Sequence, residues 1–180
     1  MARLFVAIDL PPAVTTGLSL LQPAPATGIK LTIPGQMHVT LHFIGEAEVA
    51  PVAHALQAVQ APVFGIKLAA LGQFRSRGEN IALWAGVQIC DELLDLRTSV
   101  LAALTVAGLK PEVRAYKPHI TLARCKAGVP GHVARDFLAQ PVPVSAVIPV
   151  SAFALYSSTL TSEGSLYRLE QNFMLQSRPS

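Results

Sequence analysis

The chain has 180 residues, of which 51% are hydrophobic and 14% are charged, and its formal net charge is +3. This length and hydrophobic content allow a sizeable core and exclude a largely disordered chain. The isoelectric point near 9.1 suits an anionic partner, although so small a charge excess does not by itself specify nucleic acid. Cys90 and Cys125 lack CxxC spacing and lie in apolar runs, so we expect buried free thiols in a reducing compartment.

The sequence shows no pattern of a secreted or membrane-spanning protein. The N-terminus leads directly into a strand pattern without the apolar core and cleavage site of a signal peptide. The longest apolar stretch, 139–156, is interrupted by Pro141, Pro143 and Pro149, which a simple membrane helix would not carry. We therefore expect a soluble cytoplasmic protein that does not engage a membrane.

In the first third of the chain, runs rich in β-branched and aromatic residues indicate strands, and apolar residues at helical spacing indicate helices. Pro11-Pro12 favours the start of a helix, and Pro34-Gly35 favours a turn. The expected elements are a strand at 3–10, a helix at 11–22, a short strand at 28–33, a strand at 38–45 and a helix at 46–60.

The same patterns continue to the C-terminus. The expected elements are strands at 63–71 and 80–87 joined by a loop at 72–79, a helix at 90–107, a strand at 118–124, a short helix at 132–138, a strand at 142–156, a turn at 162–164 and a strand at 166–175. The loop at 72–79 carries Arg75 and Arg77, and it either contacts phosphate or is an ordinary solvated loop. This order of elements predicts an α+β fold with mostly antiparallel pairing.

One four-residue phrase occurs twice, as His38-Val39-Thr40-Leu41 and as His119-Ile120-Thr121-Leu122. Each copy lies in an expected strand, where side chains alternate between faces, so histidine and threonine share one face and the aliphatic residues the other. The repeat suggests two similar lobes within one folding unit. Two such strands could face each other across a groove.

Opposed histidines can divide the work of proton transfer, because the ordinary pKa of histidine lies near neutrality. Displacement at phosphorus fits this arrangement, since the nucleophile loses a proton while the leaving alkoxide gains one. Thr40 and Thr121 can donate hydrogen bonds to the non-bridging phosphate oxygens. The scheme requires neither a metal ion nor a cofactor.

Other interpretations of the histidines remain open. His38 and His42 alternate onto one face and, with His119, could form a metal site, although cysteine or carboxylate ligands at recognisable spacing are not evident. His54 and His132 fall in helix-like segments and are expected at the surface. Asp9 ends the first expected strand, where it either orients a histidine or, as we favour, caps the next helix.

Several ordered segments resemble the 2H phosphoesterase superfamily and, within it, the RNA 2′,3′-cyclic phosphodiesterases formerly called 2′-5′ RNA ligases. They are RLFVAIDLP, HVTLHFIGE, GQF followed by IALWAGV, YKPHITLAR and FALYSSTL followed by GSLYRL. The resemblance covers nearly the full length. It implies that residues 1–180 form a single domain of two interleaved lobes, with two pseudo-symmetric antiparallel sheets and flanking helices around a central cleft.

The resemblance also implies the reaction and its participants. The expected activity is hydrolysis of a 2′,3′-cyclic phosphate at an RNA 3′ end to a 2′-phosphomonoester. His119 would act as base on the attacking water, His38 as acid on the departing 3′ oxygen, and Thr40 and Thr121 would hold the phosphate. The expected partner is RNA with such an end or a related nucleotide, and the protein is expected to act as a monomer without a cofactor.

Three further residues are candidates for substrate binding. Arg124 falls where the family has a phosphate-binding arginine, but strict alternation places it opposite His119, so it reaches the cleft only if the strand bends near Ala123. Phe5 either stacks on a base at the edge of the cleft or belongs to the core. Tyr167 is a weaker candidate of the same kind.

The chain departs from the family pattern at Leu31, where relatives often have tryptophan, and at His42, where they often have lysine. Both positions bear on how RNA beyond the scissile phosphate is held. Alternative functions are 2′-5′ RNA ligation or cleavage, opening of a cyclic phosphate on a nucleotide-derived metabolite, and non-catalytic binding of RNA ends.

Overall fold

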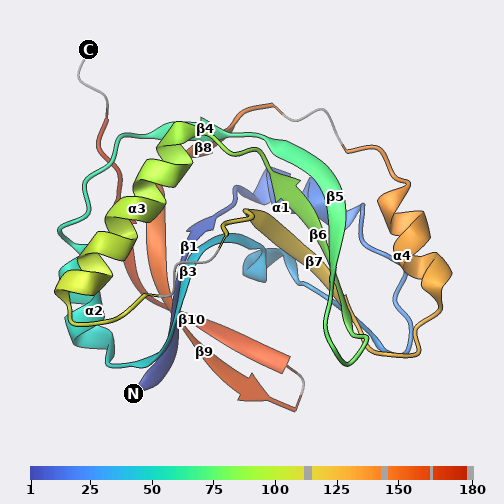
Figure 1. Ribbon diagram of the computed structural model, residues 1–180. Helices are drawn as coiled ribbons and strands as arrows, with labels where there is room; N and C mark the ends of the chain where they lie inside the picture. Colours follow the sequence, from blue (N-terminus) through green and yellow to red (C-terminus); the bar gives the residue numbers. More distant parts are fainter. Residues whose placement is uncertain (112–114, 143–145, 163, 178–180) are drawn as a thin grey trace.

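The computed structural model describes residues 1–111, 115–142, 146–162 and 164–177. The elements along the chain are β1 (Ala2–Asp9), α1 (Pro12–Ser19), β2 (Ile29–Leu31), the short 3₁₀ helix η1 (Pro34–Gln36), β3 (His38–Ala47), α2 (Val49–Leu56), β4 (Phe64–Ile66), β5 (Leu68–Arg75), β6 (Ile81–Val87), α3 (Asp91–Val106), β7 (His119–Cys125), α4 (Gly131–Leu138), β8 (Ile148–Val150), β9 (Ala152–Thr161) and β10 (Gly164–Met174). Figure 1 shows their arrangement.

Two four-stranded antiparallel sheets form the body of the molecule. The strand order is β10-β9-β1-β3 in one sheet and β2-β7-β6-β5 in the other. Each sheet combines strands from both halves of the sequence, so the chain passes repeatedly between the two lobes. The predicted α+β class with two antiparallel sheets is confirmed.

The histidine strand β3 is the edge strand of its sheet, and β7 is separated from the edge of the other sheet only by the short strand β2. β3 pairs with β1, and β7 pairs with β6, each in antiparallel register. β3 and β7 also contact each other where the two sheets meet (Figure 1). This arrangement brings the repeated phrases to the seam between the lobes, although they are far apart in sequence.

Helices cover the outer sides of the two sheets (Figure 1). α2 packs against α3 and β10, α3 packs against β3, and α4 packs against β5. α3 buries one apolar stripe, consisting of Leu93, Leu96, Val100 and Leu104, whose spacing of three and four residues follows the helical repeat. The helices therefore support the sheets on the sides that face away from the seam between them.

Two expected strands differ from the structure. The run at 63–71 is divided into β4, which pairs with β8, and β5, which continues to Arg75. The predicted loop at 72–79 is therefore shorter, because β5 stays paired with β6 up to the register pair Arg75 and Ile81. The expected strand at 142–156 includes residues 143–145, which lie outside the described residues, and its remainder forms β8 and β9.

Two smaller expectations concern the cysteines and the membrane. Both cysteines are free; Cys125 is buried as expected, whereas Cys90 is partly exposed at the start of α3. Within the described ranges, no helix combines the length and the apolar character that crossing a bilayer would need.

Candidate active site

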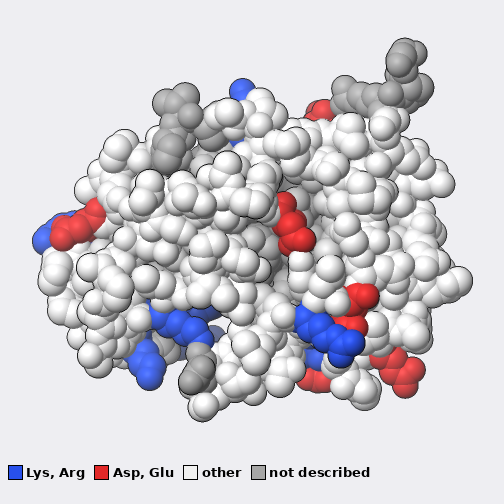
Figure 2. All heavy atoms as spheres, turned by 180° about the vertical axis from the view of Figure 1, so that it is seen from behind, with Lys and Arg blue, Asp and Glu red and all other residues white. Residues whose placement is uncertain are grey.

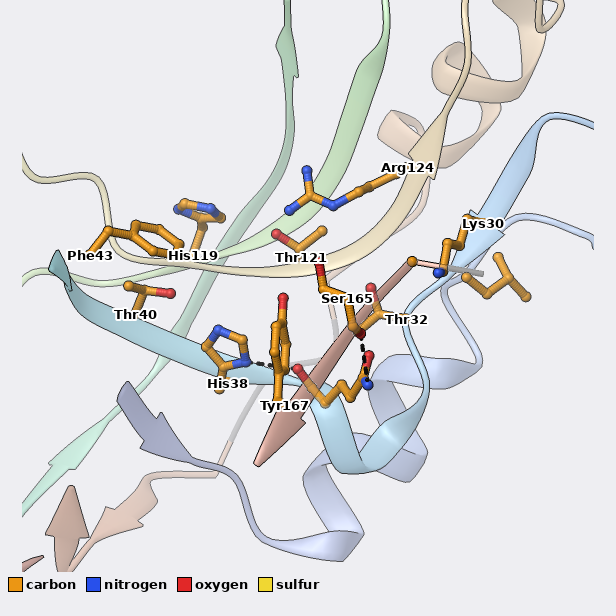
Figure 3. A pocket seen from close by; sticks show the side chains of 13 residues that line it. Lys30, Thr32, His38, Thr40, Phe43, His119, Thr121, Arg124, Ser165 and Tyr167 are labelled. Carbon is orange, nitrogen blue, oxygen red and sulfur yellow. Dashed lines mark hydrogen bonds between the residues drawn. The ribbon is translucent and has the colours of Figure 1, made fainter. Parts of the chain in front are cut away.

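A pocket lies at the seam between the two sheets and receives side chains from both (Figure 3). Its volume is about 230 Å³. We call it the central pocket. The residues that line it include His38, Thr40 and Phe43 from β3, His119, Thr121 and Arg124 from β7, Lys30 and Thr32 at β2, Gln36 of η1, and Ser165 and Tyr167 of β10.

The two histidines are held in the same way on opposite sides of this pocket. In His38, Nδ1 lies 2.7 Å from the carbonyl oxygen of Gln36, and in His119 it lies 2.7 Å from the carbonyl oxygen of Lys117. A carbonyl oxygen can only accept, so Nδ1 carries the proton in both rings. Nε2 is then the nitrogen that can exchange a proton with a ligand, and both rings belong to one pocket, as the sequence suggested.

The electrostatic surroundings of the two histidines differ. Burial lowers the pKa of His38, opposed by the Gln36 carbonyl and the Asp9 carboxylate, while His119 and Arg124 lower this pKa further. Burial also lowers the pKa of His119, opposed by the Lys117 carbonyl, with Arg124 and the Lys117 ammonium lowering it further. A carboxylate therefore favours the protonated form of His38 and has no counterpart among the groups acting on His119.

Asp9 does not cap the next helix, so that prediction is wrong. Pro11 is the residue before α1, and the helix start has no side-chain cap. The Asp9 carboxylate instead accepts hydrogen bonds of 2.8 Å from the Tyr156 hydroxyl, and Asp9 pairs with His38 in the register of β1 and β3. This is the alternative in which Asp9 acts on a histidine.

Thr40 and Thr121 line the central pocket, each two residues after its histidine. Both are partly exposed, whereas the aliphatic residues between them and the histidines, Val39 and Ile120, are fully buried. The period-two prediction therefore holds over this part of each strand. The hydroxyl groups are available to a ligand beside the imidazoles.

Arg124 also lines the pocket, because β7 contains a bulge. Thr121 pairs with Trp84 and Ala123 with Leu83, so Leu122 is an extra residue in β7. An extra residue reverses the alternation beyond it. Leu122 and Ala123 are consequently both buried, and Arg124 shares the face of His119.

β3 contains the same irregularity at the corresponding position. Thr40 pairs with Ala7 and His42 with Val6, so Leu41 is the extra residue. The reversed alternation of side chains places His42 on the buried face and Phe43, which is 66% exposed, on the face that lines the pocket. The expectation that His38 and His42 share a face is therefore wrong. Among the described residues, no group of three His, Cys, Asp or Glu side chains is placed to hold a metal ion.

The aromatic candidates Phe5 and Tyr167 have different positions. Phe5 is 2% exposed and packs behind His38, with ring centres 5.0 Å apart, so of the two predicted placements the core is the one observed. Its burial leaves no face for a nucleobase. Tyr167 lines the pocket, and its ring lies nearly perpendicular to that of His38, with ring centres 5.5 Å apart. His54 and His132 are exposed, as expected.

Sequence reasoning missed several residues that close the side of the pocket opposite the histidines. Gln36 Nε2 donates to the carbonyl oxygen of Ser165 at 3.2 Å, which joins η1 to β10. A Cβ atom at Gly164 would collide with the Lys30 side chain, and the φ of +123° at this glycine also disfavours other residues. Leu31, at the first departure from the family pattern, lines the pocket as well.

A bridge between the lobes supports the bulge in β3. The Tyr116 hydroxyl donates to the carbonyl oxygen of Thr40 at 3.0 Å, and Arg97 Nε donates to the carbonyl oxygen of Leu41 at 3.2 Å. The Arg97 guanidinium also lies over the Tyr116 ring, 4.5 Å from its centre. Burial raises the pKa of Tyr116, so this hydroxyl stays protonated as a donor.

Comparisons with known proteins agree with this architecture. The model of the 2′-5′ RNA ligase superfamily matches residues 34–159. A protein of Thermus thermophilus named RNA 2′,3′-cyclic phosphodiesterase is 31% identical, with alignment over 97% of this chain and 90% of the relative. A protein of the same name from Archaeoglobus fulgidus is 28% identical over 92% of this chain and 96% of the relative.

Solved structures show the same fold. A crystal structure of a Thermus thermophilus protein superposes with a TM-score of 0.79 at 29% identity and covers 98% of this chain and all of that one. The Escherichia coli LigT crystal structure with 3′-AMP gives a TM-score of 0.75 at 23% identity, over 97% of this chain and 98% of that one. The family match and the 31% identity to a full-length relative show that this chain belongs to the 2′-5′ RNA ligase superfamily of 2H phosphoesterases.

Proposed function

We propose that this protein hydrolyses 2′,3′-cyclic phosphate ends of RNA to 2′-phosphomonoesters by general acid–base catalysis with two histidines. Relatives that align over most of both chains carry the name RNA 2′,3′-cyclic phosphodiesterase, which supports the cyclic phosphodiesterase activity. The observation that carries the mechanism is the matched pair of Nδ1 contacts at 2.7 Å, which leaves both Nε2 atoms to serve one pocket.

The electrostatic difference between the histidines supports the division of roles. His119 is the base: the side-chain charges acting on it are those of Arg124 and Lys117, both cationic, so its neutral form is favoured. His38 is the acid: burial lowers the pKa of both rings, but at His38 the Asp9 carboxylate opposes this effect, whereas no carboxylate does so at His119. Water attacks phosphorus as His119 Nε2 takes its proton, the bond from phosphorus to the 3′ oxygen breaks, and His38 Nε2–H protonates that oxygen.

The remaining pocket residues stabilise the phosphate during this displacement. Thr40 and Thr121 donate to the non-bridging oxygens, and Arg124 balances the negative charge that develops there. Tyr167 forms a wall beside His38. We also propose that residues 1–180 act as one domain of two interleaved lobes and that one copy suffices, because β3 and β7 of a single chain supply both histidines.

The test is product analysis on an RNA oligonucleotide with a 2′,3′-cyclic phosphate end, in the presence of excess EDTA. The expected product is the 2′-phosphomonoester, and either His38→Ala or His119→Ala should lower the rate by about 10²–10⁴-fold. His54→Ala, on the exposed face of α2, is the matched control and should retain the full rate. Loss of turnover in EDTA, or a 3′-phosphate product, would contradict the proposal.

A further inference from the structure

A second hollow continues the central pocket along β2 and the turn between β5 and β6. The two share Lys30 and Arg124, so they form one continuous surface. We call this hollow the basic groove, and its polar lining includes Lys30, Arg75, Ser76, Asn80, Arg124 and Lys126.

The basic groove is strongly cationic. Its two arginines and two lysines are exposed, and none of the described residues that line it is Asp or Glu. Figure 2 shows blue side chains gathered over this part of the molecule, near the end of the β5–β6 hairpin. A surface of this kind attracts a polyanion by its charge.

Hydrogen bonds hold the separate parts of the groove together. Asn80 Oδ1 accepts from the main-chain N–H of Ala127 at 3.0 Å, which links the β5–β6 turn to the segment after β7. The N–H of Lys126 donates to the carbonyl oxygen of Gly28 at 2.8 Å, which links the same segment to the residue before β2. The cations therefore project from a connected backbone rather than from independent loops.

The opposite end of the central pocket has a different character. It opens into a hollow lined by Leu41, Phe43, Phe74 and Tyr116. Its two cations lie over aromatic rings: Arg97 is 4.5 Å from the centre of Tyr116, and Lys117 Nζ is 4.7 Å from the centre of Trp84. The arrangement of charge therefore favours the basic groove as the path for a chain of phosphates.

We propose that the basic groove binds the sugar–phosphate backbone of single-stranded RNA on the 5′ side of the terminal nucleotide. The proposal rests on the cyclic phosphodiesterase function, in which the terminal phosphate occupies the central pocket beside Arg124. Lys30, Arg75 and Lys126 then contact the preceding phosphates. The protein consequently prefers an oligonucleotide to a mononucleotide with the same cyclic phosphate.

The experiment compares adenosine 2′,3′-cyclic monophosphate with an RNA octamer that ends in adenosine 2′,3′-cyclic phosphate. The double variant Arg75→Glu/Lys126→Glu should lower kcat/KM for the octamer about tenfold at low salt and leave the mononucleotide within twofold. In the parent, log(kcat/KM) for the octamer should fall with log[salt], with a slope of roughly −0.7 for each phosphate contacted. The variant should lose most of that slope.

Lys67→Glu is the control for the effect of a changed net charge on the electrostatic attraction of RNA to the protein as a whole. Lys67 is exposed and immediately precedes β5, whereas Arg75 ends it, so roughly 25 Å of strand separates them. This variant should retain nearly all of the octamer's advantage. An equal loss in both variants, or an equal loss on both substrates, would overturn the basic groove as a binding site.

Two further outcomes separate this proposal from the proposed function. If the parent turns over neither substrate, the catalytic proposal fails, and binding of a 3′-phosphorylated octamer, measured by fluorescence anisotropy, tests the groove alone. The double variant should then weaken binding about tenfold, and unchanged binding would overturn the groove. A selective loss of octamer turnover in Lys117→Ala, whose exposed side chain lines the apolar hollow and not the basic groove, but not in the double variant, would place the RNA at the apolar end instead.

Discussion

The hydroxyl of Tyr116 donates a 3.0 Å hydrogen bond to the main-chain carbonyl of Thr40. Tyr116 stands three residues before His119, and Thr40 stands two residues after His38, so this bond connects the two histidine motifs directly. The position of one proton-transfer group relative to the other therefore depends on a contact outside the pocket.

Replacing Tyr116 by phenylalanine removes this bond and keeps the ring. The free energy of unfolding should fall by about 1–3 kcal/mol, because a main-chain acceptor at the seam is left without its donor. At a temperature where the variant is fully folded, kcat should fall several-fold with little change in KM, since the histidines are misplaced while phosphate binding persists. Denaturant titration and steady-state kinetics measure the two effects, and an unchanged kcat would mean that the bond only stabilises the fold.

The pH dependence should show the different surroundings of the two histidines. Burial lowers the pKa of both below the ordinary value of 6.5. His38 must be protonated to act as acid, so kcat/KM should fall as the pH rises through the pKa of His38, and it should be declining already at neutrality. The acidic limb should report protonation of His119, which must be neutral to act as base.

Asp9→Asn tests the assignment of the alkaline limb. The Asp9 carboxylate raises the pKa of His38 and is not among the groups acting on His119. Its removal should shift the alkaline limb of the kcat/KM profile to lower pH and leave the acidic limb in place. If the acidic limb moves instead, the roles of the histidines are reversed.

The alternation of side chains along a strand correctly predicted which residues face the pocket in the regular part of each histidine strand. His38 with Thr40, and His119 with Thr121, share a face because alternation is a local property of extended backbone. The repeat of the phrase then pointed to a common pocket. This part of the site needed no knowledge of the tertiary structure.

The same rule failed immediately beyond each threonine, for one physical reason. The bulges at Leu41 and Leu122 depend on pairing with β1 and β6, which the sequence of the bulged strand does not encode alone. Regular alternation places Phe43 on the buried face with Val39 and Leu41 and His42 on the face of His38, and both predictions are wrong. The residues after the two triplets, Leu41-His42 and Leu122-Ala123, also share no pattern that marks a bulge.

Arg124 is expected to act on the pKa of both histidines as well as on the bound phosphate. It lowers the pKa of both rings, so Arg124→Ala should shift both limbs of the kcat/KM profile to higher pH. It should also lower kcat/KM by roughly tenfold to a hundredfold through the lost charged hydrogen bonds to phosphate. The pH profile of kcat/KM measures both changes.

Arg124→Lys is the matched control for charge. It should return both limbs close to their parental positions but recover only part of the rate, because lysine lacks the planar, bidentate donor of arginine. Limbs that stay at parental pH in Arg124→Ala would show that the guanidinium does not act on the histidines.

Gly72 on β5 is predicted to be essential for the support of His119. A Cβ atom at this position would collide with the indole ring of Trp84, whose centre lies 5.8 Å from that of His119. Gly72→Val should therefore displace the indole, lower the free energy of unfolding by about 1–3 kcal/mol and reduce kcat/KM.

Gly17→Ala is the matched control, since nothing lies within 4 Å of the added methyl group and alanine favours the helix α1 by roughly 0.5–1 kcal/mol. Trp84 is the chain's single tryptophan, so its fluorescence spectrum reports the displacement directly; an unchanged spectrum and rate in Gly72→Val would show that the strand yields instead of the indole.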